Sequence, residues 1–575
     1  MSKSISLNNL SPASSSNVVV RTCLRVLDWL LGIRKMDRLY QSHRMQGLSK
    51  EQFADSLIKL LDIRVEGEAE LLDKIPRQGP VVLASNHPFG GIEGVILARA
   101  ISRVRPDLKV LANQGLRLFT ELQDYFIFTN PLKEKDPRNG PSLRQCLQHV
   151  KQGKALLMFP AGRVSYYQAD KKRVSEHTWN RVIARLCHSP DCLFVPIFVS
   201  GRNSALFYRL GRIYYRLRML MLARELLNKR GATVRLDAGF AVKGHLVDSP
   251  EHCRALSYAQ AAHWQQPWPP DTVGELNPLA EPTHVGSIET ELAQLPVEQR
   301  LHQHKHFSIY YAWQHQAPNT VREIARLREY VFRQHNEGSG EPLDTDRFDA
   351  SYTHLFVFDE LEREIVGAYR MGQTDRLLAE ANGDLNALYL NRMFEFDPTF
   401  VNRREPALEM GRSFLIPRLQ RSHIGLFLLW RGIGAFVCQF PQYRTLYGTV
   451  SISKLYDMRS VALIEKAHVT PSADARPRHA LNKAVHAEVA EFYAHTSPVT
   501  TLSSFLRSLE SDGKDIPVLM RQYLKMGATF HCLGIDPSFN HTPGMLLSVD
   551  LPKAPEKLKR LYLGEGNQDD TNWSG

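Results

Sequence analysis

The sequence predicts two domains of different class, an α/β domain followed by an α+β domain. In the first half, short apolar runs of strand length alternate with helical stretches, which is typical of a sheet covered by helices on both faces. In the second half, a hairpin signal and separate strand and helix segments replace this alternation. A proline-rich stretch at residues 265–300 lies between them and is expected to be a linker. At roughly 150 residues per domain, the chain of 575 residues is also long enough for two large units.

The first domain is expected over residues 18–264, after a polar tail at residues 1–17. It starts with an amphipathic helical stretch from Val18 to about Leu61, which either caps the domain or lies on a membrane. Five apolar runs then predict the strands of its sheet: Val81–Ala84, Leu108–Ala112, Ala155–Phe159, Leu193–Val199 and Val234–Phe240.

The second domain is expected over residues 301–560, with a polar tail at 561–575. A short helix, Ile288–Leu295, closes the linker before it. The predicted helices are Val321–Phe332, Ile424–Val437, Leu481–His495 and Pro517–Lys525. The predicted strands are the hairpin His354–Phe358 and Ile365–Tyr369, then Ala407–Phe414, Thr445–Ile452 and Leu546–Asp550.

Composition excludes several classes of protein. With 43% hydrophobic and 23% charged residues, the chain is neither largely disordered nor collagen-like. Its seven scattered cysteines contain no C-x-x-C pair, which argues against a zinc site or a secreted disulfide framework and favours a reducing cytosol. We expect neither a signal peptide nor a transmembrane helix, and hence a soluble or peripheral protein. The net charge of +12 favours anionic partners.

The first candidate site is the segment Asn86–Gly94 (NHPFGGIEG), which directly follows a predicted strand. Its Gly-Gly turn allows His87 to fold back onto Glu93. A carboxylate that orients a histidine and stabilises its imidazolium lets the other ring nitrogen accept a proton from a hydroxyl group. The alternative is structural: His87 caps the next helix and Glu93 lies in its first turn.

Two further blocks, FPAGRVS at Phe159–Ser165 and VPIFVSGRNS at 195–204, follow other predicted strands. In this order and spacing, the three blocks resemble the glycerolipid acyltransferase (PlsC-like) superfamily, and they are more similar to its hemolysin-type, lysophospholipid-acyltransferase-like branch. The resemblance covers about residues 60–245.

This resemblance implies that His87 and Glu93 are catalytic and that Arg163 and Ser165 bind substrate. The chain departs from the family pattern in three places. Glu93 replaces an aspartate, Ala161 replaces a glutamate, and Arg163 stands where the branch often has an acid. These changes leave catalysis by His87 intact but remove any inference about the acceptor headgroup.

A basic and aromatic stretch lies between Arg202 and Arg235, with Glu225 as its one acidic residue before Arg235. Such a stretch suits an interfacial helix on anionic lipid, and the alternative is a surface helix whose arginines snorkel. Nucleic acid is not expected, because no groove-reading motif accompanies the charge. The residues expected to contact the membrane are Arg209, Arg212, Tyr214, Tyr215, Arg216 and Arg218.

The second candidate site consists of charged residues at short spacings in the second domain. Together they could form a cleft for a cationic amine and for a phosphopantetheine or carrier-protein surface. As isolated pairs they would be surface ion pairs worth less than about 1 kcal/mol. His354 is expected to be a packed strand residue, and Asp536 and Asn540 are turn formers first. The site residues are Arg328 with Phe332, Asp346 with Asp349, Arg370, and Glu409 with Arg412.

Taken in order, with segments such as ALEMGRSFLIP and LLWRGIGAF, these residues resemble the acyl-homoserine-lactone synthase pattern of the GNAT-like superfamily. They are still more similar to the ornithine-acyl-carrier-protein N-acyltransferase family, over about residues 305–555. The resemblance implies that Glu409 accepts the amine proton and that Arg370 and Arg412 position the cleft. Asp346 and Asp349 would bind the cationic substrate or hold the N-terminal lobe closed.

The pyrophosphate loop of GNAT enzymes, [QR]-x-x-G-x-[GA], is not convincingly present, because the chain runs IPRLQRSHIGLFLLW after the predicted strand. This favours acyl carrier protein over coenzyme A as the acyl donor, as the family also implies. Carrier proteins are acidic, so a basic docking surface is expected.

As a whole, the chain resembles bifunctional ornithine lipid synthases. The resemblance implies N-acylation of an amino acid, ornithine, with a 3-hydroxyacyl group, followed by O-acylation of the lyso-aminolipid. It places the enzyme at the cytoplasmic face of the inner membrane, without a bound cofactor or metal. The α-amine would be the same in ornithine, lysine, glycine and glutamine. Two alternatives stay open: a lysophospholipid acyltransferase whose second domain acylates another amine, and a non-catalytic lipid- or carrier-binding protein.

Overall fold

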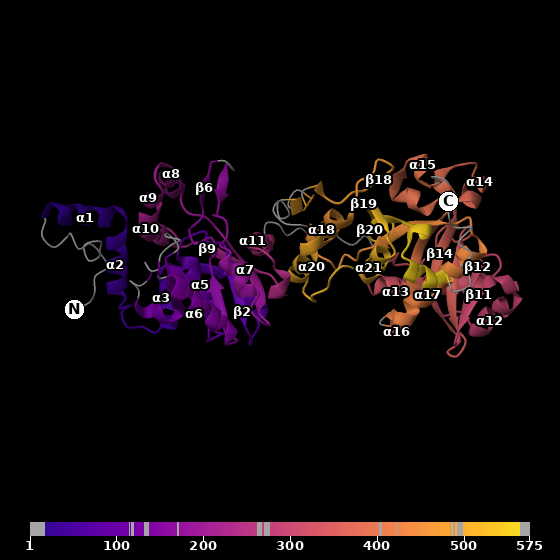
Figure 1. Cartoon of the computed structure of the whole chain (residues 1–575), viewed down its shortest axis with the longest axis horizontal. Helices are drawn as coiled ribbons and strands as arrows, with labels where there is room; N and C mark the ends of the chain where they lie inside the picture. Colours follow the sequence, from indigo (N-terminus) through magenta and orange to yellow (C-terminus); the bar gives the residue numbers. More distant parts are fainter. Residues whose placement is uncertain are drawn as a thin grey trace. The chain divides into compact units, whose positions relative to one another are not determined.

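The computed structural model shown in Figure 1 forms two compact units. The first contains Met1–Gln265 and Ala490–Asp515, and the second contains Gln266–Val489 and Ile516–Gly575. The structure describes residues 18–113, 116, 120–130, 137, 139–169, 172–261, 267–268, 276–401, 405–420, 422–483, 485–486, 489–490 and 498–563.

The first unit is built on an eight-stranded sheet in the order β1-β9-β8-β2-β5-β3-β4, with β10 added to β8. The pairings are parallel except for β8 with β9 and β10 with β8. The five predicted strands are all present, and every residue of β2 is buried, as expected for a central strand. The strands are β1 (Arg64–Glu66), β2 (Val81–Ser85), β3 (Lys109–Asn113), β4 (Phe126–Thr129), β5 (Ala155–Met158), β8 (Leu193–Ser200), β9 (Thr233–Ala238) and β10 (Val242–Lys243).

Helices and one hairpin, β6 (Tyr166–Gln168) with β7 (Arg173–Ser175), complete this unit. The predicted amphipathic stretch is three helices, because Gly32 adopts a left-handed conformation after the first and a capping box at Ser49 starts the third. The helices are α1 (Val18–Leu30), α2 (Ile33–Ser42), α3 (Lys50–Leu60), α4 (Glu68–Asp73), α5 (Ile92–Ser102), α6 (Asn139–Lys151), α7 (Val182–Cys187), α8 (Ala205–Ile213), α9 (Tyr215–Leu220), α10 (Leu222–Leu227) and α11 (Pro250–Ala259).

Helix α20 (Pro498–Leu509) also belongs to the first unit, although the sequence analysis placed residues 301–560 in one domain. The physical reason is that its apolar face, with Phe505 and Leu506 fully buried, packs beside α11 and β10. Ser504 Oγ lies 2.6 Å from Nε2 of the buried His252 on α11. The second half of the chain therefore supplies part of the first unit.

The second unit contains an eight-stranded sheet in the order β11-β12-β13-β14-β16-β17-β20-β19. Only β16 and β17 pair in parallel within this sheet. The predicted hairpin and three further strands are present, and β11, β12 and β19 were not predicted. The strands are β11 (Arg300–His304), β12 (Phe307–Trp313), β13 (Thr353–Asp359), β14 (Glu364–Gln373), β16 (Ala407–Leu415), β17 (Thr445–Ser451), β19 (Thr529–Asp536) and β20 (Thr542–Asp550), with a separate pair β15 (Phe394–Phe396) and β18 (Ala475–Pro477).

The predicted helices Val321–Phe332, Ile424–Val437 and Pro517–Lys525 correspond to α13, α17 and α21, whereas much of Leu481–His495 lies outside the described residues. None of the described helices is long and apolar enough to span a membrane. The helices are α12 (Val285–Gln294), α13 (Pro318–Arg333), α14 (Thr374–Glu380), α15 (Pro398–Val401), α16 (Pro417–Gln420), α17 (His423–Gln439), α18 (Met458–His468), α21 (Val518–Lys525) and α22 (Glu556–Leu563).

The predicted linker at 265–300 is shorter in the structure, because its second part packs on the second unit. The backbone N–H of Asn277 donates to Gly340 at 3.0 Å. On α12, the buried Glu291 carboxylate accepts the N–H groups of Asn319 and Thr320, each at 2.8 Å, and so caps α13. Proline content signals a break in periodicity, but it does not exclude ordered packing of the residues that follow.

Candidate active sites

The loop after β2 carries the first site, and its conformation follows from its sequence. The side chain of Asn86 donates to Val199 O at 2.8 Å and accepts from Val199 N at 2.7 Å, which ties the loop to β8. Gly90 adopts φ +95°, and a Cβ there would lie 2.6 Å from Leu222 Cδ2. Only glycine therefore fits this turn without strain.

The turn brings His87 and Glu93 together, as predicted. His87 Nδ1 lies 3.0 Å from Glu93 Oε1, and the Glu93 side chain is fully buried at the first turn of α5. The N–H groups of Phe89, Gly90 and Gly91 donate to the same carboxylate at 2.8–2.9 Å. The catalytic and the helix-capping interpretations of the segment therefore describe one arrangement, in which the capping carboxylate also holds the histidine.

Charge and burial act in opposite directions on this pair. Burial works to raise the pKa of Glu93, but His87 and the backbone donors outweigh it and lower that pKa to about 2. Burial also works to lower the pKa of His87, whereas the Glu93 carboxylate and, to a smaller extent, Glu176 raise it above its ordinary value. With Nδ1 turned to Glu93, Nε2 is the ring nitrogen left to take a proton from a substrate.

The backbone and ring of His87 are fixed from several sides. The N–H and the hydroxyl of Ser165 both donate to His87 O, at 2.9 and 3.2 Å. Ser165, which the family resemblance made a substrate-binding residue, thus lies against the loop backbone. The Phe159 ring is 4.7 Å from the imidazole, centroid to centroid. The N–H of His87 donates to the carboxylate of Glu176, a residue that the sequence analysis did not select.

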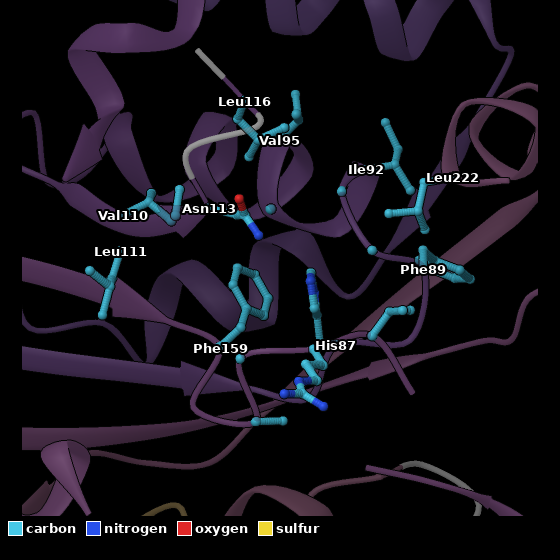
Figure 2. Close-up of a pocket in the computed structure, with 18 of the residues that line it drawn as sticks. His87, Phe89, Ile92, Val95, Val110, Leu111, Asn113, Leu116, Phe159 and Leu222 are labelled. Carbon is cyan, nitrogen blue, oxygen red and sulfur yellow. The ribbon is translucent and has the colours of Figure 1, made fainter. Parts of the chain in front are cut away.

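A cavity of about 1390 Å³ opens beside His87. This exceeds the roughly 300–1,000 Å³ of most small-molecule sites. Figure 2 shows His87 and Phe159 at one side of it, with apolar side chains of α5 and β3 around it. Arg163 and Trp179 also line the cavity. Such a space can hold long apolar chains next to a proton-accepting histidine. The labelled apolar lining includes Phe89, Ile92, Val95, Val110, Leu111 and Leu222.

The basic aromatic stretch forms α8, α9 and α10 in the structure. Arg209 and Arg212 are exposed, and Ile213 and Tyr214 expose 76% and 46% of their surface. Arg218 is different: only 4% exposed, it lies over the Tyr166 ring at 4.5 Å. The prediction that Arg218 contacts a membrane is therefore wrong, because the β6–β7 hairpin covers its guanidinium. The side chains of Tyr215 and Arg216 lie outside the described part of the structure.

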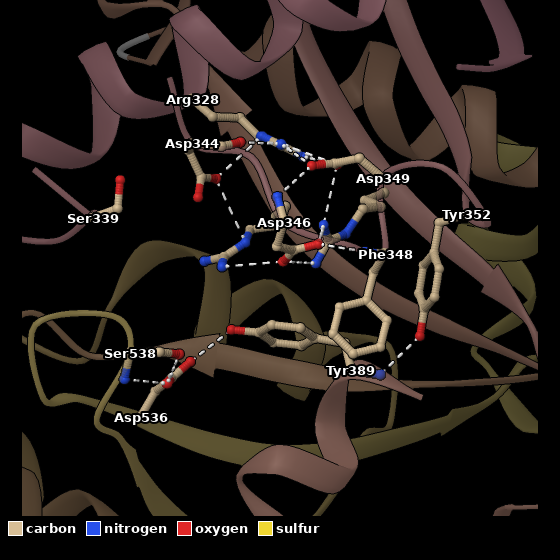
Figure 3. Close-up of polar contacts among 12 residues, drawn as sticks. Arg328, Ser339, Asp344, Asp346, Phe348, Asp349, Tyr352, Tyr389, Asp536 and Ser538 are labelled. Atoms are coloured by element: carbon tan, nitrogen blue, oxygen red, sulfur yellow. Dashed lines mark hydrogen bonds and ion pairs between the residues drawn. The ribbon is translucent and has the colours of Figure 1, made fainter. Parts of the chain in front are cut away.

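In the second unit, the predicted arginines and aspartates meet in one buried cluster, which Figure 3 shows. Arg328 pairs with Asp349 at 3.1 Å, and Arg370 pairs with Asp346 at 2.6 Å and with Asp349 at 3.1 Å. Burial works to raise the pKa of Asp349, but the charges of Arg328 and Arg370 hold that pKa below its usual range. Asp344, which the sequence analysis missed, lies 3.2 Å from Arg328 Nε.

Arg412 is the least satisfied cation of this cluster. Its nearest carboxylate oxygens are Asp344 Oδ2, 3.5 Å from Nε, and Asp346 Oδ2, 3.6 Å from Nη2. The buried Nε has no hydrogen-bond partner among the described residues. The guanidinium instead lies between the rings of Tyr389 and Phe539, at 5.0 and 4.6 Å. An arginine held by rings and long ion pairs retains donors for an anionic ligand.

A β-bulge puts Glu409 and Arg412 on the same side of β16. The pairing of β14 with β16 slips by one residue between Arg370 and Ala368, and Arg412 adopts φ +51°. Residues three apart in a regular strand face opposite sides. The bulge therefore lets both side chains meet the Tyr389–Leu390 segment, since Leu390 N–H donates to Glu409 Oε1 at 3.0 Å.

Glu409 is almost completely buried, and burial raises its pKa to about 7, although the Leu390 N–H, the charge of Arg370 and nearby tyrosine hydroxyls oppose this. Tyr447 donates to its Oε2 at 3.3 Å. A carboxylate with a pKa near neutrality can accept and release protons at physiological pH. In the parallel pairing of β16 with β17, Glu409 is opposite Tyr447, and this pairing ends one residue later, where the two strands separate.

The remaining predicted residues lie around this cluster. Phe332 packs edge-on against Phe539, the ring beneath Arg412, at 5.1 Å. His354 is buried on β13 and bonds to the carbonyl of Asp349 at 2.9 Å; burial lowers its pKa to about 4. Asp536 accepts a 2.6 Å hydrogen bond from the Tyr389 hydroxyl. Within the described ranges, no group of three or more His, Cys, Asp or Glu side chains is placed to hold a metal ion.

Two family models match the chain, one in each half. Residues 23–250 match the family described as Acyltransferase, and residues 327–431 match the Acetyltransferase (GNAT) domain. Each half therefore carries an acyltransferase domain. The predicted enzyme class is confirmed, and so is the fold class of an acyltransferase-type α/β domain followed by a GNAT-like domain.

Curated relatives match parts of the chain. Glycine N(alpha)-acyltransferase of Bacteroides thetaiotaomicron is 34% identical over 167 residues, which is 27% of this chain and 49% of the relative. The protein of the same name from Phocaeicola vulgatus is 31% identical over 182 residues, 30% of this chain and 56% of the relative. Lyso-glycine lipid O-acyltransferase of Phocaeicola vulgatus is 28% identical over 198 residues, 32% of this chain and 67% of the relative.

The chain thus spans about half the length of the glycine N-acyltransferases that it matches. Among solved structures, a CoA-dependent acyl-homoserine lactone synthase, BjaI, with SAM and isopentyl-CoA covers 44% of this chain and 86% of its own, at 9% identity and a TM-score of 0.24. A TM-score this low supports no argument about function.

Proposed function

We propose that the protein makes an amino-acid-containing lipid in two acyl transfers. The second unit joins a 3-hydroxyacyl group to the α-amine of an amino acid, and the first unit then acylates the 3-hydroxyl of that lyso-lipid. The observation that carries this proposal is the His87–Glu93 pair beside a cavity of about 1390 Å³, in a chain whose other half holds a buried carboxylate next to an arginine cluster. Relatives named for an N-acyl and an O-acyl transfer support it.

In the O-acyl transfer, Nε2 of His87 takes the proton of the 3-hydroxyl as that oxygen attacks the thioester carbonyl. A C–O bond forms, the C–S bond breaks, and the thiol leaves with the proton that the imidazolium returns. Glu93 stabilises the imidazolium through its 3.0 Å contact with Nδ1. The size and apolar lining of the cavity suit the acyl chains of both reactants.

In the N-acyl transfer, Glu409 is the proton acceptor for the attacking amine. Its carboxylate is almost completely buried, so we place a water molecule between it and the nitrogen. A C–N bond forms as the thioester C–S bond breaks, and the proton passes to the departing thiolate. The raised pKa of about 7 suits a group that must both accept and release this proton.

Arg412 is proposed to hold the α-carboxylate of the amino acid, because its ion pairs are the longest of the cluster and its Nε has no hydrogen-bond partner among the described residues. Asp346 and Asp349 are bonded to Arg370 and Arg328, which supports their role in holding the lobe together rather than binding the amine. Arg412→Lys should raise the KM for the amino acid roughly 10-fold or more, since a carboxylate contact is worth about 1.5–3 kcal/mol. An amino acid amide lacks the carboxylate, so wild-type protein should acylate it slowly. The Arg412→Lys variant should lower that rate little further.

Two amino acids are candidates for the acceptor. The family resemblance of the second half implies ornithine, whereas the names of the relatives favour glycine. The donor is proposed to be acyl carrier protein, since the pyrophosphate-binding loop expected for coenzyme A is not convincingly present in the sequence after β16. Competition between acyl carrier protein and coenzyme A thioesters of the same acid, in one reaction mixture, tests this choice.

We also propose that the first unit binds the cytoplasmic face of the inner membrane peripherally. Exposed apolar side chains on α8 and α9 lie beside the exposed Arg209 and Arg212. Helix α1 exposes a second apolar face that includes Trp29, 66% exposed. Apolar residues next to arginines favour anionic lipid surfaces.

The test is expression in a host that lacks amino acid lipids, followed by mass analysis of the lipid extract. A diacylated amino acid is expected, and an extract without any acylated amino acid would refute the proposal. The main alternative, a lysophospholipid acyltransferase whose second unit acylates another amine, would instead consume lysophosphatidate when the purified protein is assayed. A non-catalytic lipid- or carrier-binding protein would yield neither product.

A further inference from the structure

A second buried carboxylate, Glu176, lies against the backbone of His87. It directly follows the β6–β7 hairpin and is 2% exposed. Its Oε1 accepts the N–H of His87, and its Oε2 accepts the indole N–H of Trp179 at 3.0 Å. Its own carbonyl accepts from the side chain of Gln168 at 2.8 Å, so the residue is held at both its backbone and its side chain.

Helix α11 supplies the other neighbours of this carboxylate. Burial raises the pKa of Glu176 above its ordinary value, although the Trp179 indole, the His87 N–H and the charge of Arg254 work against it. Burial and the charge of Glu176 in turn raise the pKa of Tyr258. Arg254 is anchored on the ring of Tyr258, 4.4 Å from its centroid. The His87 N–H and the Trp179 indole N–H, which bond to the two carboxylate oxygens, are both donors. An ionised carboxylate accepts from both, whereas a carboxamide has only one acceptor oxygen.

We infer that Glu176 is a positioning residue for His87. Its carboxylate binds the backbone N–H of His87 and adds negative charge near the imidazole, while Glu93 binds the ring itself. The inference rests on the proposed O-acyl transfer. His87 is then fixed at three points: its N–H by Glu176, its carbonyl by Ser165, and Nδ1 by Glu93. Because a misplacement of about 1 Å can cost on the order of 100-fold in rate, such fixation has a kinetic effect.

Glu176 is also connected to the cavity wall through its hydrogen bond with Trp179. Trp179 lines the same cavity as His87, so one carboxylate connects the catalytic loop to the surface that contacts the acyl chains. Glu176 is 89 residues from His87 in the sequence. A function in orienting His87 explains why a buried acid is placed here without an arginine bonded to its oxygens in the described structure.

The test compares Glu176→Gln with wild type in the full-length protein, using lyso-aminolipid and acyl donor. A kcat lower by roughly 10-fold to 100-fold is expected, with KM within about twofold. Loss of one negative charge near the imidazolium should lower the pKa of His87, so the acidic limb of the rate profile should also move to lower pH. The other titratable or charged groups around His87 and Glu176 are Glu93 from α5, Arg254 and Tyr258 from α11, and Lys229, which interacts with Glu93.

Glu121→Gln is the matched control, because Glu121 is also a buried carboxylate of the first unit that accepts one backbone N–H and one side-chain donor. Its partners are Gly47 N at 3.2 Å and the Tyr40 hydroxyl at 2.7 Å, and it does not contact His87. It should keep the wild-type profile. A Glu176→Gln profile that matches that of Glu121→Gln overturns the inference.

Trp179→Phe decides the case in which Glu176→Gln does not fold, since it removes a single donor and keeps a ring in the wall. A lower kcat is expected, and a wild-type kcat overturns the inference. N-acylation by the same preparations reports whether the chain is intact. If wild-type protein makes the N-acyl product but never acylates its hydroxyl, the proposed O-acyl transfer itself fails, which is a different result.

Discussion

Glu93 in the first unit and Glu409 in the second are both buried carboxylates, but their acidities differ strongly. The pKa of Glu93 falls to about 2, whereas that of Glu409 rises to about 7. Glu93 faces three backbone donors and a histidine, while Glu409 faces one backbone donor and weakly acidic phenols. Burial alone therefore does not set the acidity of a carboxylate, because the charges and the hydrogen-bond donors that face it decide whether burial prevails.

The comparison assigns the two carboxylates different tasks. A permanently ionised Glu93 can stabilise a histidine cation but is a poor proton acceptor near neutral pH. Glu409, in contrast, is poised to exchange a proton itself. Substitutions at each carboxylate should therefore affect different reactions.

Glu409→Gln should lower N-acylation by roughly 100-fold to 10,000-fold, since it removes the proton acceptor. Because the lyso-lipid would no longer form, the diacylated product should disappear as well. Rates with purified protein and supplied amino acid check this.

Glu337→Gln is the matched control, because burial also raises the pKa of Glu337 to about 7, and its carboxylate contacts Ser451 at 3.2 Å. It should retain N-acylation. The reverse outcome, with Glu337→Gln inactive and Glu409→Gln active, would move the proton acceptor to Glu337.

Glu93→Gln should lower O-acylation by roughly 100-fold, because the imidazolium loses its counter-charge. It should also lower the free energy of unfolding by about 1.5–3 kcal/mol, since hydrogen bonds to a charged acceptor are lost. Denaturant unfolding and the O-acyl rate measure the two effects. Glu93→Asp keeps the charge and should lie between wild type and Glu93→Gln; equal activity of all three proteins would contradict the role of the pair.

The pH dependence of the two reactions should separate them. Below the Glu409 pKa of about 7, the ionised fraction of this carboxylate falls about tenfold per pH unit, so kcat for N-acylation should fall with it. In the Glu409→Gln variant this limb should vanish from the residual rate. A residual rate with the same limb would assign the titration to another group.

The smallest effect is expected at the membrane. Ile213→Asp should weaken binding to anionic vesicles by at least roughly tenfold, because burying one such side chain contributes about 1.5–3 kcal/mol. Val297→Asp is the control, since Val297 is 78% exposed but lies in the second unit. Sedimentation with vesicles measures the binding of both variants, and equal binding would contradict the proposed contact between α8 and the membrane.

The sequence predicts most where contacts are local. His87 and Glu93 are six residues apart, and a glycine turn between them was enough to predict their pairing. The strands of the first sheet were found because buried parallel strands are continuous apolar runs. In the second unit, the paired charges were grouped by family resemblance, and the structure brings them into one cluster.

Distant packing was not predictable in this way. Glu176 and Tyr389 act on residues far along the chain, and neither belongs to a motif with a recognisable spacing. Arg218 has the periodicity of a surface arginine, and only the ring of Tyr166 reveals that it is covered. The packing of α20 on the first unit was not predictable either. An amphipathic pattern shows which face of a helix is buried, but it does not specify the surface that covers this face.

The most direct test of the two-step account is the lipid mass spectrum of three strains of one host, which express wild type, His87→Ala and Glu409→Gln. We expect a diacylated amino acid from wild type, only the mono-acylated lyso-form from His87→Ala, and neither from Glu409→Gln. If His87→Ala removed both forms, or Glu409→Gln left the diacylated lipid in place, the assignment of one acyl transfer to each unit would be contradicted.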